Sequence, residues 1–320
     1  MEFILLAFLL MAALVFGQAQ MDECLTQTID NPIWQQYAGN VTGMMNATMA
    51  LIPVPYTLAR SKIPATYNIL SAGYKTLLPN LPDDMYPMLF QSAFDHGIRL
   101  GNETIPGLDP TVETAHSVRE STNTLSFQHA FLGWPFVDPL GDGASSFIWV
   151  PDVLISAGAT LPTSGARAYG DCVYQTLFDP ACDAYGAISG GGTAVNATSN
   201  DGSGAFFESN WRDTAWSSEW EQLLAFFVNV TNQPSFGNAS MCDNQIRLFS
   251  TPGSPGVYAA RPIVGEVLFY SPLLSLNVTE CEVKGVQVGT PFIENNEVSC
   301  ESLKDYGGAD IQGWITGTGH

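Results

Sequence analysis

The stretch NPIWQQYAGNVTGMMNATMALI, residues 31–52, decides how the first half of the chain is interpreted. Asn31 followed by Pro32 is typical of a helix N-cap with proline at the first helical position. Apolar residues then recur at steps of three and four until Pro53 and Pro55 end the run. The pattern predicts an amphipathic helix with Asn46 on the face opposite the apolar stripe. The stripe comprises Trp34, Tyr37, Val41, Met44, Met45, Leu51 and Ile52.

Two further helices are predicted in the same half of the chain. Asp83 and Asp84 provide an N-cap for a helix over Met85–His96, and a shorter helix is expected over residues 109–119. Together these patterns predict a helical N-terminal region over residues 20–122.

Short apolar or alternating runs between Gly, Pro and Asp turns follow from residue 125, and they predict strands. One helix interrupts them, because Ser218-Glu-Trp-Glu221 is a capping box followed by apolar residues at helical spacing. Gly186–Gly204, rich in Gly, Ser and Asn, predicts an exposed loop. We therefore expect an α+β fold: N-terminal helices, then a mainly antiparallel, disulfide-bonded β region over residues 123–320, within one continuous globular unit. The expected strands are Leu125–Val137, Ser146–Ile155, Cys172–Phe178, Ile246–Ser250, Val257–Tyr270 and Val283–Val288.

Residues 1–19 are expected to be a signal peptide. The apolar run Phe3–Phe16 is shorter than a bilayer requires, and small and polar residues follow it. No later run is long enough for a membrane span, so none is expected in the mature chain. Asn-X-Ser/Thr sequons exceed the roughly two or three that chance would supply, which predicts a secreted or extracellular-surface glycoprotein. The sequon residues are Asn40, Asn46, Asn102, Asn196, Asn229, Asn238 and Asn277.

The six cysteines form an even set without metal-ligand spacing, which predicts disulfides and allows about 15 connectivities. Local loop closure favours Cys172–Cys182 and Cys281–Cys300, which leaves Cys24 to pair with Cys242.

The acidic character of the chain excludes some partners. Its net charge of −20 arises from 11 Lys and Arg against 31 Asp and Glu. Nucleic acids and anionic lipid surfaces both require basic patches, so neither is expected as a partner.

Metal sites are considered at two places. Imidazoles of His96, His116 and His129 would bind a metal if the fold brought them together, but ordinary structural roles are favoured. Asp138 and Asp142 have oxygens suited to calcium, although carboxylates in such a Gly-rich stretch more often serve the turn itself. No cofactor is expected, with calcium kept as an alternative.

The segment Asn210–Trp220 has the composition of a small-ligand site. Trp211 and Trp216 offer flat apolar surfaces, and Arg212 offers a planar fork for a carboxylate. The alternative is that Trp211, Trp216 and Trp220 belong to the core and that Arg212 pairs with Asp213 or Glu219.

Arg212 with Trp216, an early helix at 31–52 and the later stretch 250–262 resemble Cache-type extracellular sensor domains. The resemblance implies a PAS-like antiparallel sheet and capture of a small ligand by the Arg and Trp residues.

These observations favour a non-enzymatic secreted module that binds a small ligand or an extracellular protein or glycan. A structural coat or matrix glycoprotein is the first alternative. A secreted hydrolase of unfamiliar type is the second, because no common catalytic motif is present.

Overall fold

The computed structural model describes residues 30–101, 103–104, 125–238, 240–251, 253–274 and 279–305, and about half of them lie in strands. The strands are β1 (Val41–Pro55), β2 (Asn68–Ile69), β3 (Met85–Leu100), β4 (Glu103–Thr104), β5 (Leu125–Asp138), β6 (Phe147–Trp149), β7 (Asp152–Ser156), β8 (Cys172–Asp179), β9 (Gly186–Ala187), β10 (Thr193–Ser199), β11 (Ala205–Asp213), β12 (Ser235–Phe236), β13 (Met241–Arg247), β14 (Arg261–Phe269) and β15 (Thr279–Ser299). The helices are α2 (Tyr56–Lys62), α3 (Ser71–Leu77), α4 (Thr160–Ala168) and α5 (Ser218–Val230), with 3₁₀ turns η1 (Gly256–Tyr258) and η2 (Cys300–Leu303).

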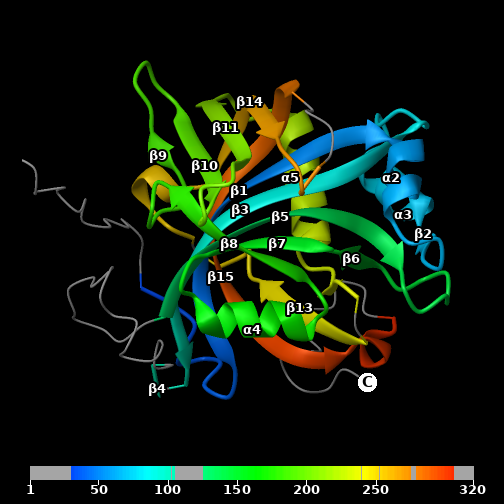
Figure 1. Ribbon diagram of the computed structural model, residues 1–320, viewed down its shortest axis with the longest axis horizontal. Coiled ribbons are helices and arrows are strands. Elements are labelled where there is room, and N and C mark those ends of the chain that lie inside the picture. The colour runs from blue at the N-terminus through cyan, green and yellow to red at the C-terminus, as the bar shows by residue number, and fades with distance from the viewer. Residues whose placement is uncertain are drawn as a thin grey trace, which may run out of the picture.

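Four long strands, in the order β15–β1–β3–β5, form a central antiparallel sheet (Figure 1). The sheet closes on itself by two routes. One runs from β5 through β7, β8, β10, β11 and β14 to β15, and the other runs from β5 through β6, β12 and β13 to β15. Neighbouring strands are antiparallel along both routes except at β7–β8 and β6–β12.

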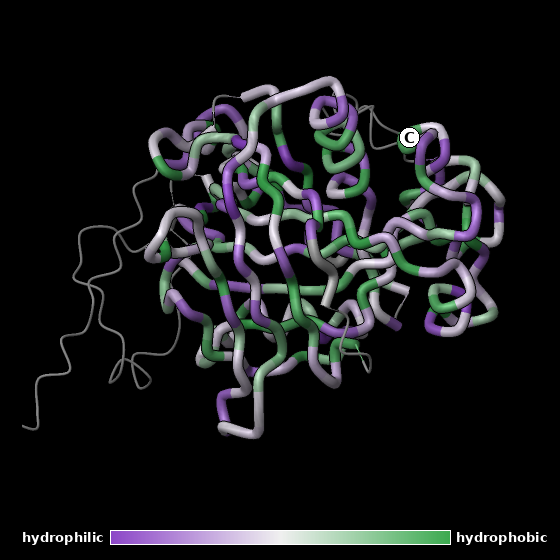
Figure 2. The backbone as a smooth tube through the Cα atoms, turned by 90° about the horizontal axis from the view of Figure 1, so that it is seen from above, coloured by the Kyte–Doolittle hydropathy of each residue, from purple (hydrophilic) through white to green (hydrophobic). Residues whose placement is uncertain are grey.

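The two routes cover opposite faces of the central sheet. Phe90 of β3 packs against Phe207 of β11 and Phe269 of β14, with ring centroids 5.1 and 5.4 Å apart. Its neighbour Gln91 points the other way and lines a cavity together with Gln245 of β13. Both faces of β1 and β3 are therefore buried, and hydrophilic and hydrophobic residues are interspersed along the long strands (Figure 2).

The expected fold class, N-terminal helices followed by a sheet, is wrong. The helices predicted at 31–52 and Met85–His96 are largely strands β1 and β3, which pair along their length from Val41↔Leu100 to Pro55↔Met85. Residues 109–119 lie outside the described residues. A strand buried on both faces carries apolar residues on both of them, so some of its apolar residues also fall at helical spacing.

The predictions for the second half agree better with the structure. Helix α5 is present, and its buried residues are Trp220, Leu223, Phe226, Phe227 and Val230. Its N-cap is Ser217 rather than Ser218, and the Ser217 side chain makes no capping hydrogen bond. The expected loop Gly186–Gly204 instead contains β9 and β10, and β10 pairs with β11 as a hairpin. None of the described helices is long and apolar enough to cross a bilayer.

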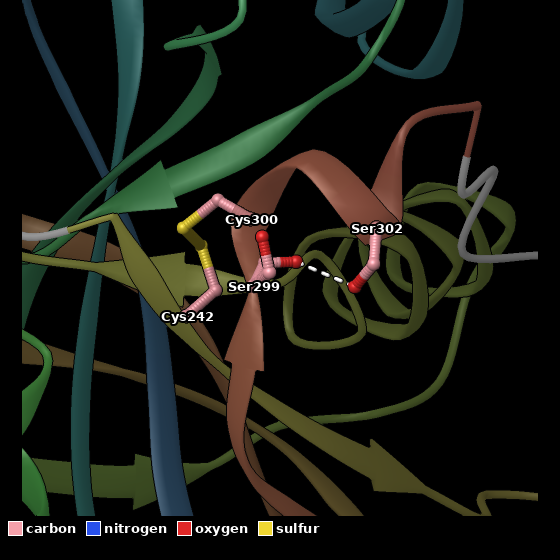
Figure 3. The surroundings of a disulfide bond; sticks show 4 residues. All are labelled: Cys242, Ser299, Cys300 and Ser302. Atoms are coloured by element: carbon pink, nitrogen blue, oxygen red, sulfur yellow. Dashed lines mark hydrogen bonds between the residues drawn. A yellow bond between two sulfur atoms is a disulfide. The ribbon is translucent and has the colours of Figure 1, made fainter.

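A disulfide joins Cys242 of β13 to Cys300 of η2, with the Cα atoms 5.1 Å apart (Figure 3). The bond fixes β13 to the end of β15, beside the turn in which Ser302 Oγ donates to the Ser299 carbonyl at 2.6 Å. The proximity pairings are thus wrong. Cys300 pairs with Cys242 rather than Cys281, and Cys172 is a free, exposed thiol while Cys182 is disulfide-bonded.

Candidate functional site

A cavity of about 410 Å³ lies on the face of the central sheet that β6, β12 and β13 cover. Its walls come from β3, β5, β7, β13 and β15, and helix α4 closes one side. This volume suits a small molecule, because ligand cavities range from about 300 to 1,000 Å³.

One wall is apolar. Phe127 and Phe131 of β5 face Val153 and Ile155 of β7, and Leu161 of α4 completes this side. Side chains alternate between the two faces of a strand, so the residues directly before and after these strand residues point away from the cavity.

The opposite wall is polar and comes from β13 and β15. Asp243, Gln245 and Arg247 alternate along β13, and Gln245 lies in register with Glu294 of β15. Gln245 Nε2 donates to Glu294 Oε2 at 3.0 Å, whereas Gln245 Oε1 has no hydrogen-bond partner. Buried polar atoms are rarely left without a partner, so this wall is suited to meeting a ligand.

Asp95 and His129 meet where the polar wall joins the central sheet. His129 Nδ1 lies 3.7 Å from Asp95 Oδ2, and Gln91 Nε2 lies 3.1 Å from His129 Nε2. With the Gln91 amide donating, the ring proton of neutral His129 is on Nδ1 and faces Asp95. Asp95 Oδ1 has no partner although the side chain is only 1% exposed.

Burial suppresses charge on both groups. Desolvation raises the pKa of Asp95 to about 7, with Arg247 opposing and Asp243 reinforcing the shift. Desolvation, reinforced by Arg247, lowers the pKa of His129 to about 3. Near neutral pH the imidazole is therefore uncharged, and Asp95 exchanges its proton readily, as a general acid or base must.

Arg247 is the only arginine or lysine among the described residues that line the cavity. Its Nη1 donates to the Thr231 carbonyl, its Nε lies 3.4 Å from Met45 Sδ, and Nη2 has no protein partner among the described residues. Burial lowers the pKa of Arg247, but a guanidinium stays charged at physiological pH. The free Nη2 is suited to an oxygen that carries negative charge.

Glu294 and Asp243 form a carboxyl pair. Desolvation and then the charge of Asp243, to which Glu294 is hydrogen-bonded, raise the pKa of Glu294 well above its usual range. A hydrogen bond between two carboxyl groups requires a proton on one of them, and the raised pKa places it on Glu294. Desolvation and then the charge of Asp243 raise the pKa of Asp171 in the same direction.

The arrangement supports acid–base chemistry. Schiff-base catalysis requires a lysine, and no described lysine lines the cavity. No group of three or more His, Cys, Asp or Glu is placed to hold a metal within the part of the chain that the structure describes.

The residues predicted to bind a ligand do not line this cavity. Alternation along β11 places Trp211 in the core and Arg212 on the surface, where Arg212 Nη2 lies 3.5 Å from Glu282 Oε1. Trp216 is 46% exposed. Trp211 and Trp220 are buried, as the alternative expected, whereas Trp216 is exposed and Arg212 pairs with Glu282 rather than with Asp213 or Glu219.

The positions considered for metals have other roles. Asp138 accepts backbone N–H groups from Gly141, Asp142 and Gly143, which is turn chemistry. Asp142 itself accepts from Ser145, whose hydroxyl and backbone N–H lower the pKa of Asp142 to about 2. His116 lies outside the described residues.

The sequon residues differ in accessibility. Asn238 is exposed, and Asn40, Asn196 and Asn229 are partly buried. Asn46 is completely buried: its Oδ1 accepts from Ser254 and its Nδ2 lies 3.3 Å from His96 Nε2. A glycan on Asn46 is incompatible with this fold. Asn102 and Asn277 lie outside the described residues, as does Cys24.

Comparison with known proteins gives no family. No family model and no curated protein matches the sequence. Among solved structures, the chain is similar to the enduracididine biosynthesis enzyme MppR complexed with pyruvate (9% identity, TM-score 0.42, covering 80% of this chain and 88% of that one). It is also similar to an acetoacetate decarboxylase-like enzyme from Sphingomonas wittichii RW1 (10% identity, TM-score 0.38, covering 81% and 94%).

The matching structures are enzymes, whereas the sequence predicted a non-enzymatic binding module. The reaction has to be inferred from the cavity itself. The resemblance to Cache-type domains stays a prediction.

Sequence reasoning missed the polar wall, although β13 carried a signal. In Asp243-Asn-Gln-Ile-Arg247, charged and amide side chains occupy alternate positions of a strand, which is unusual for a buried one. Asp95 and Glu294 gave no such signal, because only strand pairing brings them to Arg247.

Proposed function

We propose that the protein is an enzyme that moves a proton at a carbon atom next to a carbonyl group of a small substrate. The observation that carries the proposal is the buried Asp95 carboxyl, whose Oδ1 has no hydrogen-bond partner, in a cavity beside an arginine and a protonated Glu294. A pKa close to the working pH suits a general base, and perturbed carboxyls in a cavity are typical of active sites.

In this reaction the Asp95 carboxylate removes a proton from the carbon atom. The C–H electrons form a C=C bond, and the carbonyl electrons move to oxygen. The Arg247 guanidinium stabilises the negative charge that develops on the oxygen. Glu294, whose proton is shared with Asp243, stays neutral and so does not repel that charge. Return of the proton from Asp95 to carbon completes the cycle, and the apolar wall limits access of water.

The test is hydrogen exchange at carbon. Butan-2-one, pyruvate and aminoacetone are incubated with the protein in D₂O, and loss of the α-proton signal is followed by NMR. We expect exchange above the buffer rate for at least one compound. Asp95→Asn should reduce it by about 10²-fold or more, the usual contribution of a general base. Absence of exchange with all three compounds, or an unchanged rate in Asp95→Asn, contradicts the proposal.

We further propose that the enzyme works outside the cytosol. The sequon excess and the disulfides Cys242–Cys300 and at Cys182 support this, because both features belong to oxidising compartments. Expression in a eukaryotic secretory host should give glycosylated protein in the medium, with glycan at Asn238 and none at Asn46. Recovery only from the cytosol, without glycan, contradicts this proposal.

A further inference from the structure

The cavity holds more acidic groups than cations. Asp95, Asp171, Asp243 and Glu294 all line it, against Arg247 alone. His129 adds no positive charge near neutral pH, because burial lowers its pKa to about 3. The empty cavity therefore limits its negative charge by keeping protons on carboxyl groups.

The excess is concentrated at one end. After desolvation, the largest influence on the pKa of Asp95 is the charge of Arg247, which lowers it. After desolvation, the pKa of Arg247 is in turn raised by the charges of Asp95, Asp243 and Glu294. After desolvation, the pKa of Asp171 is raised by the charges of two other acids, Asp243 and Asp152. The end of the cavity at Asp171, just after helix α4, is thus the part that no arginine or lysine among the described lining residues compensates.

One oxygen of each acid at this end lacks a donor, although Asp243 also shares the proton of Glu294. Oδ1 of Asp171 and Oδ1 of Asp243 are both buried without a hydrogen-bond partner, as is Oδ1 of Asp95 on a side chain only 1% exposed. Asp171 Oδ1 and the Asp171 backbone nitrogen pack closely against Gly237, where an added Cβ would overlap both atoms. The three acids line a cavity of small-molecule size, so a donor bound there would meet acceptors that lack a partner.

We propose that the substrate carries an ammonium group, held between Asp171 and Asp243, while its carbonyl group lies at Asp95 and Arg247. An ammonium group donates up to three hydrogen bonds and supplies the positive charge that the carboxyl groups lack. The placement of the carbonyl rests on the proposed acid–base function, whereas the ammonium site stands on the charges and unpartnered atoms alone.

The first experiment measures binding without catalysis. Calorimetry compares n-butylammonium with butan-1-ol, its neutral counterpart, on the wild-type protein and on Asp171→Asn. We expect butylammonium to bind with release of protons near pH 7 and at least tenfold more tightly than butan-1-ol. Asp171→Asn should weaken butylammonium at least tenfold and leave butan-1-ol unchanged.

Asp152→Asn is the matched control. Asp152 lies close enough to influence Asp171, but it accepts a hydrogen bond from Tyr174 Oη at 3.2 Å and does not line the cavity. Its substitution should change butylammonium affinity by less than twofold. If Asp171→Asn does not fold, Asp243→Asn provides the same comparison.

Equal affinity for butylammonium and butan-1-ol, or unchanged affinity in folded Asp171→Asn, overturns the ammonium site. Its failure is distinguishable from failure of the proposed reaction. Exchange of butan-2-one without ammonium binding removes the site and keeps the reaction, whereas ammonium binding without exchange of any carbonyl compound does the reverse.

Discussion

Replacing Asp95 by asparagine should stabilise the protein at slightly alkaline pH. The pKa of Asp95 rises from 3.8 in an unfolded chain to about 7 in the fold, so the folded state binds the proton more tightly. As pH increases between these values the unfolded state ionises first, and the free energy of unfolding falls. A difference of about three pKa units corresponds to a loss of about 4 kcal/mol that is complete above pH 7.

Asparagine removes this loss and keeps the shape of the side chain, with an oxygen that can still face His129 Nδ1. Urea unfolding followed by tryptophan fluorescence, with disulfides oxidised, should therefore give Asp95→Asn a higher free energy of unfolding than wild type at pH 8. The gain should reach about 4 kcal/mol there and approach zero near pH 4, where both states hold the proton.

Asp138→Asn is the control, since Asp138 is equally buried but its carboxylate accepts three backbone N–H groups. That substitution should destabilise the fold by about 1–3 kcal/mol. If Asp95→Asn is instead less stable than wild type at pH 8, the Asp95 carboxylate is charged and compensated by Arg247, and the reasoning about its proton is refuted.

Three other variants test separate parts of the description. His129→Gln should lose less stability in acid than wild type. The pKa of His129 falls from 6.5 in the unfolded chain to about 3 in the fold, so the free energy of unfolding of the wild type decreases by about 1.4 kcal/mol per pH unit below about 6.5. Urea unfolding at pH 4 checks this. Arg212→Ala should change stability by less than about 0.5 kcal/mol, because its ion pair is exposed; a larger loss of melting temperature would contradict the surface assignment. Replacing both Cys242 and Cys300 by serine removes a crosslink with a sequence separation of 58, and in the chain-entropy model this should lower the free energy of unfolding by about 4 kcal/mol. The loss is measured as a lower urea midpoint, and unchanged stability would argue against the bond.

The sequence predicted helix α5 and strand β5 but failed for the long strands β1 and β3. Helix α5 was recognisable because its apolar residues form one stripe and its other side is exposed. In β1, every residue from Thr42 to Ala50 is buried, so the alternation that identifies a strand is absent. The hairpin β10–β11 was hidden by composition, although Thr193, Val195 and Ala197 alternate with more exposed residues.

The candidate site could not be assembled from the sequence, because its parts are joined by strand pairing over long distances. Asp95 is in β3, His129 in β5, Arg247 in β13 and Glu294 in β15. Each residue alone has an ordinary alternative, a satisfied core histidine or a surface acid. Only the order β13–β15–β1–β3–β5 brings them to one face of one sheet.

The central strands contribute side chains to the cavity on one face and to the aromatic core on the other. The cavity therefore cannot widen by separating these strands without also opening the aromatic core. Helix α4 belongs to neither route of the sheet, and Gly158 and Gly170, which flank it, both have positive φ. Its backbone amides should therefore exchange with deuterium through local opening, well before those of β1 and β3, which exchange only on global unfolding. Molecules would then enter and leave the cavity past α4, at a frequency set by that local opening and independent of the stability of the whole fold.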